Sequence, residues 1–227
     1  MLDASLVTWQ LADSAFPSGS YTLSHGLEGY AQARAIDAGA VAALLDDLLL
    51  HAIGPADATA LALAHRAALE DDWATVCEVD ARLHASKLTR ETRQASLRIG
   101  RQLLPLCGEV FPSPQLERLA QLTAARTTPG MQAIVIGVSY AGAGVPQREA
   151  VGADLFAFCS SFAGAALRLR LADHRTAQLL LRGAAPAIEQ ATSAALLRGP
   201  QEIGGCAPAA DVMSARHERA DAKLFAS

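Results

Sequence analysis

The chain has 227 residues, of which 51% are hydrophobic and 19% charged, and its formal net charge is −4 at pH 7. This composition excludes a disordered or fibrous protein, and the length allows a hydrophobic core that needs no disulfide or structural metal. The acidic balance also lacks the clustered basic surface that binding of nucleic acid requires. The sequence therefore predicts a globular protein that does not bind nucleic acid.

The cysteines and the apolar segments indicate the compartment. Cys77, Cys107, Cys159 and Cys206 are far apart and form no Cys-x-x-Cys pair, so we expect reduced thiols that are mostly buried. The N-terminal residues lack the charged start and the unbroken apolar stretch of a secretory signal. The most apolar segment, residues 131–145, is shorter than the roughly 20 residues that cross a bilayer. These features predict a cytoplasmic protein without a membrane span.

Helical periodicity dominates the sequence. Hydrophobic residues recur at three- and four-residue steps, whereas clusters of β-branched residues and hairpin turns are nearly absent. In residues 40–53 this spacing buries the leucines on one face and leaves Asp46 and Asp47 on the other. Gly54-Pro55 follows and is expected to end this first long helix.

The rest of the chain shows the same periodicity in segments that end near glycine or proline. Helices are predicted over residues 57–70, 73–85, 89–104, 114–128, 131–145, 147–171 and 175–198. Ser113 is expected to cap the helix that starts at Pro114, and a kink is expected near Gly183 and Pro186. Segment 131–145 is apolar on nearly every side, which is typical of a central helix. The predicted fold class is all-α, a single-domain bundle of about eight to ten helices.

The composition of the sequence changes after Pro200. Residues 1–200 form the predicted helical body, whereas residues 201–227 are punctuated by glycine and proline and lack a broad apolar face. We expect this C-terminal tail to be mobile on its own. Leu224 and Phe225 would expose apolar area at its end, so they are expected to dock, either on the body of the same chain or on a partner.

No motif for nucleotide or metal chemistry is present. The sequence lacks a Gly-x-x-x-x-Gly-Lys-Ser/Thr loop, and its six histidines form no His-Glu-x-x-His or repeated Glu-x-x-His pattern. His25 and Glu28 stand three residues apart, but one such pair supplies only two ligands. We assign no catalytic, cofactor-binding or metal-ligating residue from these patterns.

Single residues leave two further interpretations open. Asp13, His25 and Glu28 could in principle do acid–base work. An aspartate followed by a serine, as at Asp13, is more typical of a cap or turn acceptor. Arg168 lies among leucines, which is typical of the solvated edge of a helix, and an arginine finger that reaches a partner's nucleotide is the alternative.

The segment LADSAFPSGSYTLSHGLEGYAQ, residues 11–32, departs from the helical pattern. A Phe-Pro-Ser-Gly turn lies between two predicted helices and fixes a particular backbone path. Gly26, at the start of the second helix, costs about 1 kcal/mol relative to alanine unless another group approaches closely. Close packing against another helix is the simplest explanation for this glycine.

This segment resembles the N-terminal signature of the UreF family of urease accessory proteins. The signature reads Asp-Ser-x-Phe-Pro-x-Gly-x-x-x-x-Ser-x-Gly-Leu-Glu, and the matching residues are Asp13, Ser14, Phe16, Pro17, Gly19, Ser24, Gly26, Leu27 and Glu28. Three further segments resemble the family in the same order, namely RQASLRIGRQLL at 93–104, the helix around 134–137, and MSARHE followed by KLFAS in the tail. The resemblance spans nearly the whole chain.

The resemblance implies a non-catalytic, all-helical homodimer that assists the maturation of nickel urease. It implies binding to the scaffold protein UreD (also called UreH), recruitment of the GTPase UreG, and delivery of nickel to apo-urease without a tightly bound cofactor. The residues expected to bind partners are those of the signature together with Tyr21, His25, Arg168, Arg216, His217, Lys223, Leu224 and Phe225. The signature and the tail would meet UreD, with ordering of these segments on contact, and Arg168 would face UreG.

Three positions depart from the family pattern. Gln132 stands where a histidine is common, which puts a metal-relay role at this position in doubt. Lys223 and Ala226 stand where the usual Arg-Leu-Phe-Arg-Ser tail has arginines. Lysine keeps the charge but lacks the bidentate fork of arginine, so we expect looser contacts at Lys223.

Two other classes of function stay open at this point. An all-helical enzyme for a small molecule that uses Asp13, His25 and Glu28 predicts a closed polar pocket at the Phe-Pro-Ser-Gly turn. A stand-alone nickel carrier predicts nickel bound by the purified chain through His25. The hypothesis of a non-catalytic scaffold predicts instead that changes in the two terminal segments weaken partner binding and leave the helices intact.

Overall fold

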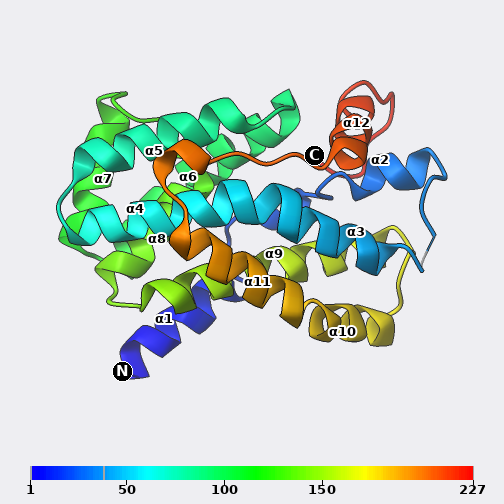
Figure 1. Cartoon of the computed structure of the whole chain (residues 1–227), viewed down its shortest axis with the longest axis horizontal. Coiled ribbons are helices and arrows are strands. Elements are labelled where there is room, and N and C mark those ends of the chain that lie inside the picture. The colour runs from blue at the N-terminus through cyan, green and yellow to red at the C-terminus, as the bar shows by residue number, and fades with distance from the viewer. Residues whose placement is uncertain (1, 38, 227) are drawn as a thin grey trace.

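The computed structural model describes residues 2–37 and 39–226 and is a bundle of helices (Figure 1). These residues contain no β-strand, which confirms the all-α prediction. The α-helices are α1 (Leu2–Ala12), α2 (Leu27–Gln32), α3 (Val41–Leu48), α4 (Thr59–Leu69), α5 (Trp73–Ser86), α6 (Arg90–Val110), α7 (Pro114–Ala124), α8 (Gln132–Gly142), α9 (Gln147–Arg168), α10 (His174–Gly183), α11 (Ala185–Leu197) and α12 (Pro208–His217). Three further helical elements are η1 (Ser20–Thr22), η2 (Leu49–Ala58) and η3 (Pro200–Glu202).

The core is built around α8, as its apolar sequence predicts. Helices α4, α6, α7 and α9 pack against α8, and residues 133–141 of α8 are all buried. The close approach of α4 depends on Gly137, because a Cβ at that position would lie 2.7 Å from the carbonyl oxygen of Leu61. Leu45 of α3 and Phe162 of α9 are fully buried in the same core.

The first long helix does not end at Gly54-Pro55, which corrects the prediction from the sequence. Helix α3, the π-helical η2 and α4 follow one another without interruption over residues 41–69. Pro55 has no N–H to donate to the carbonyl oxygen of His51, four residues earlier, and the backbone widens into a π-helical segment instead of breaking. That oxygen accepts a hydrogen bond of 2.8 Å from the backbone N–H of Cys206 and thereby holds the linker to the tail.

Most other helix ends follow local sequence rules. Four helices have a capping side chain that accepts a backbone N–H, namely Asp72 for α5, Thr89 for α6, Ser113 for α7 and Asp173 for α10. The predicted kink in the last long helix is a break, because α10 ends at Gly183 and Pro186 lies in the first turn of α11. Helix α6 continues beyond its predicted end at Leu104, through Pro105, to Val110.

Two features bear on the expected compartment. The stretches Val41–Leu69 and Gln147–Arg168 are long and apolar enough to span a membrane by length and composition, but most of the first and nearly half of the second is buried inside the bundle. Core helices of globular proteins have the same properties. All four cysteines are free thiols; Cys107 and Cys159 are buried, Cys77 is half-buried and Cys206 is exposed.

The C-terminal tail packs on the body of the same chain. Helix α12 lies against α2, so that residues far apart in sequence are side by side (Figure 1). Phe225 is only 4% exposed, whereas Leu224 is 67% exposed. The sequence left open whether Phe225 docks on its own chain or on a partner. In the structure it docks on its own chain. Mobility of the tail in solution stays a prediction.

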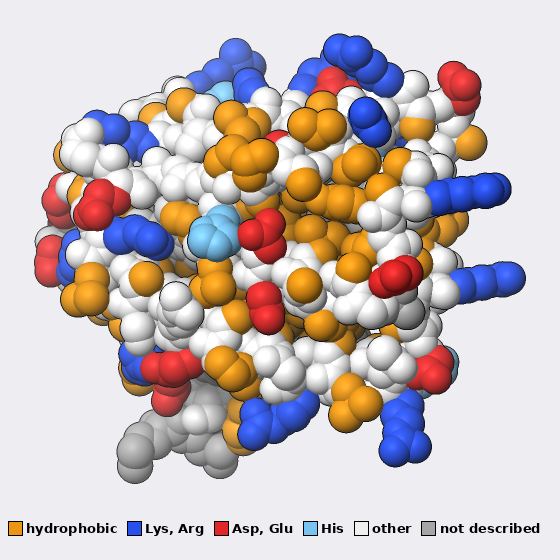
Figure 2. Space-filling model, turned by 45° about the vertical axis from the view of Figure 1, so that its right-hand side comes forward, with side chains coloured by type: hydrophobic (Ala, Val, Ile, Leu, Met, Phe, Trp, Pro, Cys, Tyr) orange, Lys and Arg blue, Asp and Glu red, His pale blue; other side chains and the backbone are white. Residues whose placement is uncertain are grey.

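The surface mixes charged and hydrophobic side chains. On the face shown in Figure 2, hydrophobic side chains line a hollow, and Lys and Arg side chains stand at its edge. Large hydrophobic side chains are also exposed singly, including Trp9 of α1 and Leu179 of α10. Single exposed hydrophobic residues are ordinary on folded proteins, so they do not by themselves indicate a binding site.

Candidate functional site at the junction of the two terminal segments

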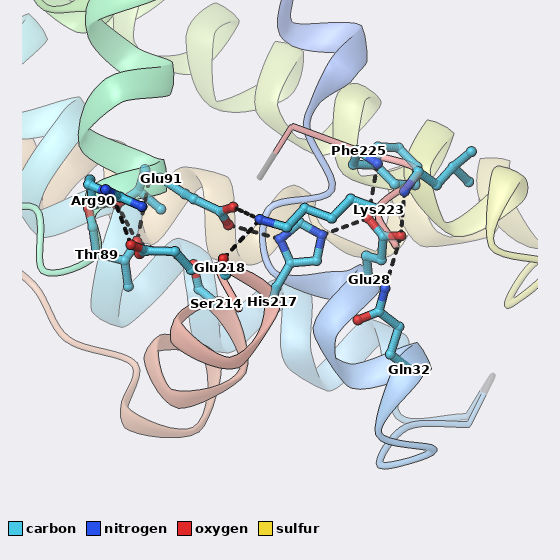
Figure 3. Close-up of polar contacts among 12 residues, drawn as sticks. Glu28, Gln32, Thr89, Arg90, Glu91, Ser214, His217, Glu218, Lys223 and Phe225 are labelled. Atoms are coloured by element: carbon cyan, nitrogen blue, oxygen red, sulfur yellow. Dashed lines mark hydrogen bonds and ion pairs between the residues drawn. The ribbon is translucent and has the colours of Figure 1, made fainter. Parts of the chain in front are cut away.

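The N-terminal signature and the C-terminal tail meet in one cluster of polar contacts (Figure 3). We call this cluster the terminal junction; it comprises residues 13–32, 89–91, 168 and 214–226. The segments are joined by backbone as well as by side chains, because Ala226 donates its N–H to the carbonyl oxygen of Thr22 at 2.8 Å. The structure therefore brings together most of the residues that the family resemblance singled out.

The start of the signature forms a fixed turn. The Asp13 carboxylate accepts a hydrogen bond of 2.7 Å from the backbone N–H two residues later, and Ser14 is exposed. Phe16 is buried and stacks on the phenylalanine that follows α6, with ring centroids 6.1 Å apart. The carbonyl oxygen of Pro17 accepts a hydrogen bond of 2.7 Å from the side chain of Gln102. Asp13 is thus a turn acceptor, as its position next to a serine indicated.

Glycines allow the backbone path that follows the turn. Gly19 and Gly26 have φ angles of 84° and 85°, in the left-handed region that favours glycine. A Cβ on Gly26 would make only an ordinary contact, 3.7 Å from the carbonyl oxygen of Ala210. A Cβ on Gly29 would instead collide with the carbonyl oxygen of Met213 in α12. The close helix packing that we expected at Gly26 therefore depends on Gly29, and Gly26 is needed for its φ angle.

Glu28 binds the tail directly (Figure 3). Its Oε1 accepts hydrogen bonds from the backbone N–H of Leu224 at 2.7 Å and from the side chain of Gln32 at 3.2 Å. Its Oε2 accepts one from the backbone N–H of Phe225 at 2.9 Å and lies 2.8 Å from Nε2 of His217. Glu28 is 4% exposed, and a buried carboxylate is tolerated only when its oxygens are bonded in this way. Three of its four partners belong to the tail.

His217 connects Glu28 to a second carboxylate. Its side chain is fully buried, and Nδ1 lies 2.8 Å from Oε2 of Glu91. Lys223 donates from Nζ to Oε1 of Glu91 at 2.5 Å and to the carbonyl oxygen of Glu218 at 3.1 Å. Burial raises the pKa of Glu91, but the hydrogen bonds from Lys223 and His217 outweigh this effect and hold the pKa below its ordinary value.

Sequence reasoning missed the residues that α6 contributes to the junction. Glu91 lies two positions before the segment that resembles the family, but nothing in the sequence shows that it faces the tail. Arg90 forms an ion pair of 2.9 Å with Glu218, and the Thr89 hydroxyl lies 3.3 Å from that of Ser214. The only local signal is Thr89 as a helix cap, which places the start of α6 but not its neighbours.

Arg168 joins both terminal segments from the end of α9. Its guanidinium lies over the ring of Tyr21, 3.9 Å from the centroid, and over the ring of Phe225 at 4.3 Å. Nη1 donates to the carbonyl oxygen of Tyr21 at 2.5 Å, and Nε donates to that of Gly164 at 3.1 Å. In this structure, the side chain is therefore engaged inside the chain, and it is neither a freely solvated helix edge nor an extended finger.

The other expected residues divide between interior and surface. Ser24 and Leu27 are fully buried beneath the signature, whereas Arg216 is exposed on α12. Tyr21 and Leu224 are each 67% exposed. Arg168 stacks on Tyr21 and on Phe225, and the backbone of Leu224 is bonded to Glu28. The junction therefore presents the ring of Tyr21 in a held position and exposes the side chain of Leu224 beside it.

His25 lies in a separate environment. Its Nε2 is 3.0 Å from Oγ of Ser161. That hydroxyl donates its own hydrogen to a backbone carbonyl oxygen, so Nε2 carries the proton. The ring meets the edge of Phe158, with centroids 4.6 Å apart. Burial, helped by the charges of Lys87 and Arg168, lowers the pKa of His25 to about 4, and the imidazole is neutral at pH 7.

A cavity of about 550 Å³ opens beside His25. Gln132, which stands where the resemblance led us to expect a histidine, lines it, as does Asp154 of α9. Lys87 at the same cavity is paired with Asp57, with Nζ–O distances of 2.7 and 2.9 Å. Burial, together with the Asp57 charge, raises the pKa of Asp154 to about 7. The cavity thus contains one neutral histidine and one carboxyl group that titrates near neutral pH.

The structure does not assemble the residues of the two alternative functions. The pocket at the turn exists and Asp13 and His25 line it, but Glu28 is bound to the tail and is not part of the lining. No group of three or more His, Cys, Asp or Glu side chains is arranged to hold a metal ion within the part of the chain that the structure describes. The junction is suited to docking, because the carboxylates of Glu28 and Glu91 bond to donors from the tail.

Comparisons with known proteins show the family of the chain. The UreF family model matches residues 36–185. The chain is 32% identical over 223 residues to the urease accessory protein UreF of Paenarthrobacter aurescens strain TC1. This alignment covers 98% of the chain and 97% of the relative. It is 29% identical to UreF of Trichodesmium erythraeum, covering 100% and 98%, and 29% identical to UreF 2 of Brucella canis, covering 95% and 89%. The chain belongs to the UreF family of urease accessory proteins.

Proposed function

We propose that this chain assists urease maturation as a non-catalytic scaffold that binds UreD, also called UreH. The similar relatives are named urease accessory proteins and match over nearly their whole length, which supports a role in maturation and favours a function without catalysis. The main support for a scaffold role is the terminal junction, in which Glu28 of the signature holds the tail through three hydrogen bonds.

The junction suits a partner surface because its exposed side chains are held in place. Arg168 stacks on both Tyr21 and Phe225, so the Tyr21 ring loses little freedom when a partner covers it, and the backbone of Leu224 is already in place. Tyrosine is enriched among the few residues that contribute most of the free energy at protein interfaces, and a preorganised side chain loses less entropy on binding. In this proposal, UreD covers these two residues.

The proposal extends to the other components that the family likeness implies. The scaffold recruits the GTPase UreG and assists nickel delivery to apo-urease, as a homodimer in the cytoplasm. Nickel is handled transiently by the assembled complex, and the chain holds no cofactor tightly. Because Arg168 is engaged with Tyr21 and Phe225, a UreG surface that includes Arg168 would adjoin the one that UreD covers.

Copurification with UreD tests the scaffold directly. The chain is coexpressed with UreD from the same organism, and the amount of UreD retained is compared for the full chain, Glu28→Ala and a chain that ends at Ala222. We expect both changes to reduce the retained UreD about tenfold or more, since tail docking is lost. Helix content, measured by circular dichroism, is expected to stay the same because residues 223–226 belong to no helix and the helices around α8 do not contain Glu28.

Glu109→Ala is the matched control. Glu109 is an exposed carboxylate in the same helix as Glu91 but lies at the opposite end of α6. We expect this variant to retain as much UreD as the unchanged chain. Undiminished binding of UreD by the chain that ends at Ala222 would overturn the scaffold proposal.

A further inference from the structure

The buried imidazole of His217 faces a carboxylate on each side. Nε2 lies 2.8 Å from Glu28, and Nδ1 lies 2.8 Å from Glu91. A neutral imidazole has a single N–H, so it can donate to one carboxylate and must turn a lone pair toward the other. Both contacts are hydrogen bonds only when the cluster contains one proton more than a neutral imidazole and two carboxylates.

The extra proton also balances the charge of the cluster. With His217 protonated, the positive side chains of His217 and Lys223 match the negative ones of Glu28 and Glu91. Loss of the proton leaves a net negative charge at a place where the His217 side chain is fully buried and that of Glu28 is 5% exposed. An uncompensated buried charge is strongly unfavourable, so the tail contacts that surround it must weaken.

The neighbouring charged groups do not substitute for this proton. The groups that face or adjoin His217 are Glu28 on α2, Glu91 on α6, Lys223 in the tail, and the Arg90–Glu218 ion pair beside them. Lys223 already donates to Glu91, and Arg90 is 2.9 Å from Glu218. The remaining polar neighbour, Gln32, is uncharged and donates to Glu28.

We propose that docking of the tail takes up a proton at His217, so that the terminal junction assembles when His217 is charged and releases the tail as the pH rises. This regulation rests on the proposed function, in which the docked tail forms part of the partner surface. At the acid end, protonation of Glu91 removes an acceptor and also ends docking. Because the pKa of Glu91 is held below its ordinary value, this loss on the acid side comes at a lower pH than protonation of an ordinary glutamate.

Hydrogen exchange of the full chain without any partner tests this coupling. Protection of peptides from residues 218–226 is measured by mass spectrometry between about pH 6 and about pH 9 and corrected for the intrinsic exchange rate. We expect the protection of the tail to fall by up to about tenfold per pH unit once His217 loses its proton, as coupling to one proton requires. Peptides from α8 should keep their protection throughout.

Two variants separate the proton from other causes. In Glu91→Gln, the amide can donate to Nδ1 of a neutral His217 while Nε2–H still donates to Glu28, so tail protection should become independent of pH over this range. His51→Gln removes an exposed histidine that pairs with Asp47 at 3.9 Å outside the junction, and this control should keep the pH dependence of the unchanged chain.

Constant tail protection across this pH range in the unchanged chain would overturn the proposal, as would an unchanged pH dependence in Glu91→Gln. A tail that exchanges freely at every pH would overturn it too. These outcomes do not involve UreD. If tail protection depends on pH as expected but loss of the tail leaves UreD binding intact, the proposed function fails and the proton coupling stands.

Discussion

The core around α8 and the terminal junction are stabilised by different interactions. In the core, fully buried side chains such as Phe162 and Leu61 each contribute about 1.5–3 kcal/mol by leaving water, and this contribution does not depend on pH. In the junction, buried charges on Glu28, His217 and Glu91 attract one another, but loss of their hydration opposes most of that gain. The core therefore secures the fold, whereas the polar contacts of the junction set the position of the tail.

The two regions should therefore respond separately to substitution. Local opening of a segment that has few buried apolar contacts requires less free energy than global unfolding. Changes in the core should lower the global stability, and changes in the junction should release the tail while the helices stay folded. Three substitutions test whether the two regions respond separately.

The largest effect is expected from Phe162→Ala, which removes a fully buried ring from the core. We expect the free energy of unfolding to fall by about 3–5 kcal/mol, because transfer of the ring from water is lost and a cavity remains. Urea denaturation measures this change. Phe156→Ala on the same helix, where the ring is 44% exposed, is the matched control and should lower stability by less than about 1.5 kcal/mol. Equal losses in both variants would contradict the position of the core.

Asp154→Asn tests the charged groups that line the cavity between the two regions. The pKa of Asp154 is raised to about 7 in the folded chain, so the folded state keeps a proton that the unfolded chain loses near pH 4. Stability should therefore fall as the pH rises from about 4 to about 7, and the asparagine variant should escape this fall.

At about pH 8 we expect Asp154→Asn to be more stable than the unchanged chain by up to about 4 kcal/mol, with a smaller gain if water reaches the carboxyl group. Near pH 4 the two should unfold at similar temperatures, as thermal denaturation at both pH values would show. Glu109→Gln, at an exposed position, should show no such pH-dependent gain. A destabilised Asp154→Asn at pH 8 would mean that the carboxylate has an unrecognised favourable partner.

The smallest effect is expected from Arg168→Lys. Lysine keeps the charge but loses the planar guanidinium that covers the rings of Tyr21 and Phe225. Tail docking should weaken by about 0.5–1 kcal/mol, seen as a two- to fivefold loss of hydrogen-exchange protection in the tail with an unchanged melting temperature. Arg170→Lys, two residues further on and exposed, should change neither. A lower melting temperature for Arg168→Lys would show that the junction supports the fold as well.

The sequence predicts the core far better than it predicts the junction. Periodic leucines and capping residues such as Ser113 act over a few residues, so their helices could be placed directly. The break expected at Pro55 was wrong because a widened helix turn accommodates the proline, and the carbonyl oxygens of His51 and Pro55 there bond to a linker that is distant in sequence. Glu91 was missed for the same reason, since its partners in the tail lie more than a hundred residues away.

The site residues were found through family likeness more than through chemistry. A motif can show that Glu28 belongs to a signature, but only the folded chain shows that its carboxylate receives the backbone of Leu224 and Phe225. The reason for Gly29 was likewise invisible, because the carbonyl oxygen that excludes a side chain there belongs to Met213. Contacts between the two ends of a chain produce no periodic pattern in the sequence of either end.

The carbonyl oxygen of His51, freed by Pro55, has a consequence for how far the tail can travel. It anchors the linker at Cys206. The neighbouring residue must be a glycine, because a Cβ on Gly205 would lie 2.5 Å from the same oxygen. A detached tail thus stays tethered a short distance from its binding site, at an effective concentration on the order of millimolar. A protein that binds at the place of the docked tail must outcompete this intramolecular ligand, whereas a protein that covers the docked tail need not, and dilution of the chain changes neither case.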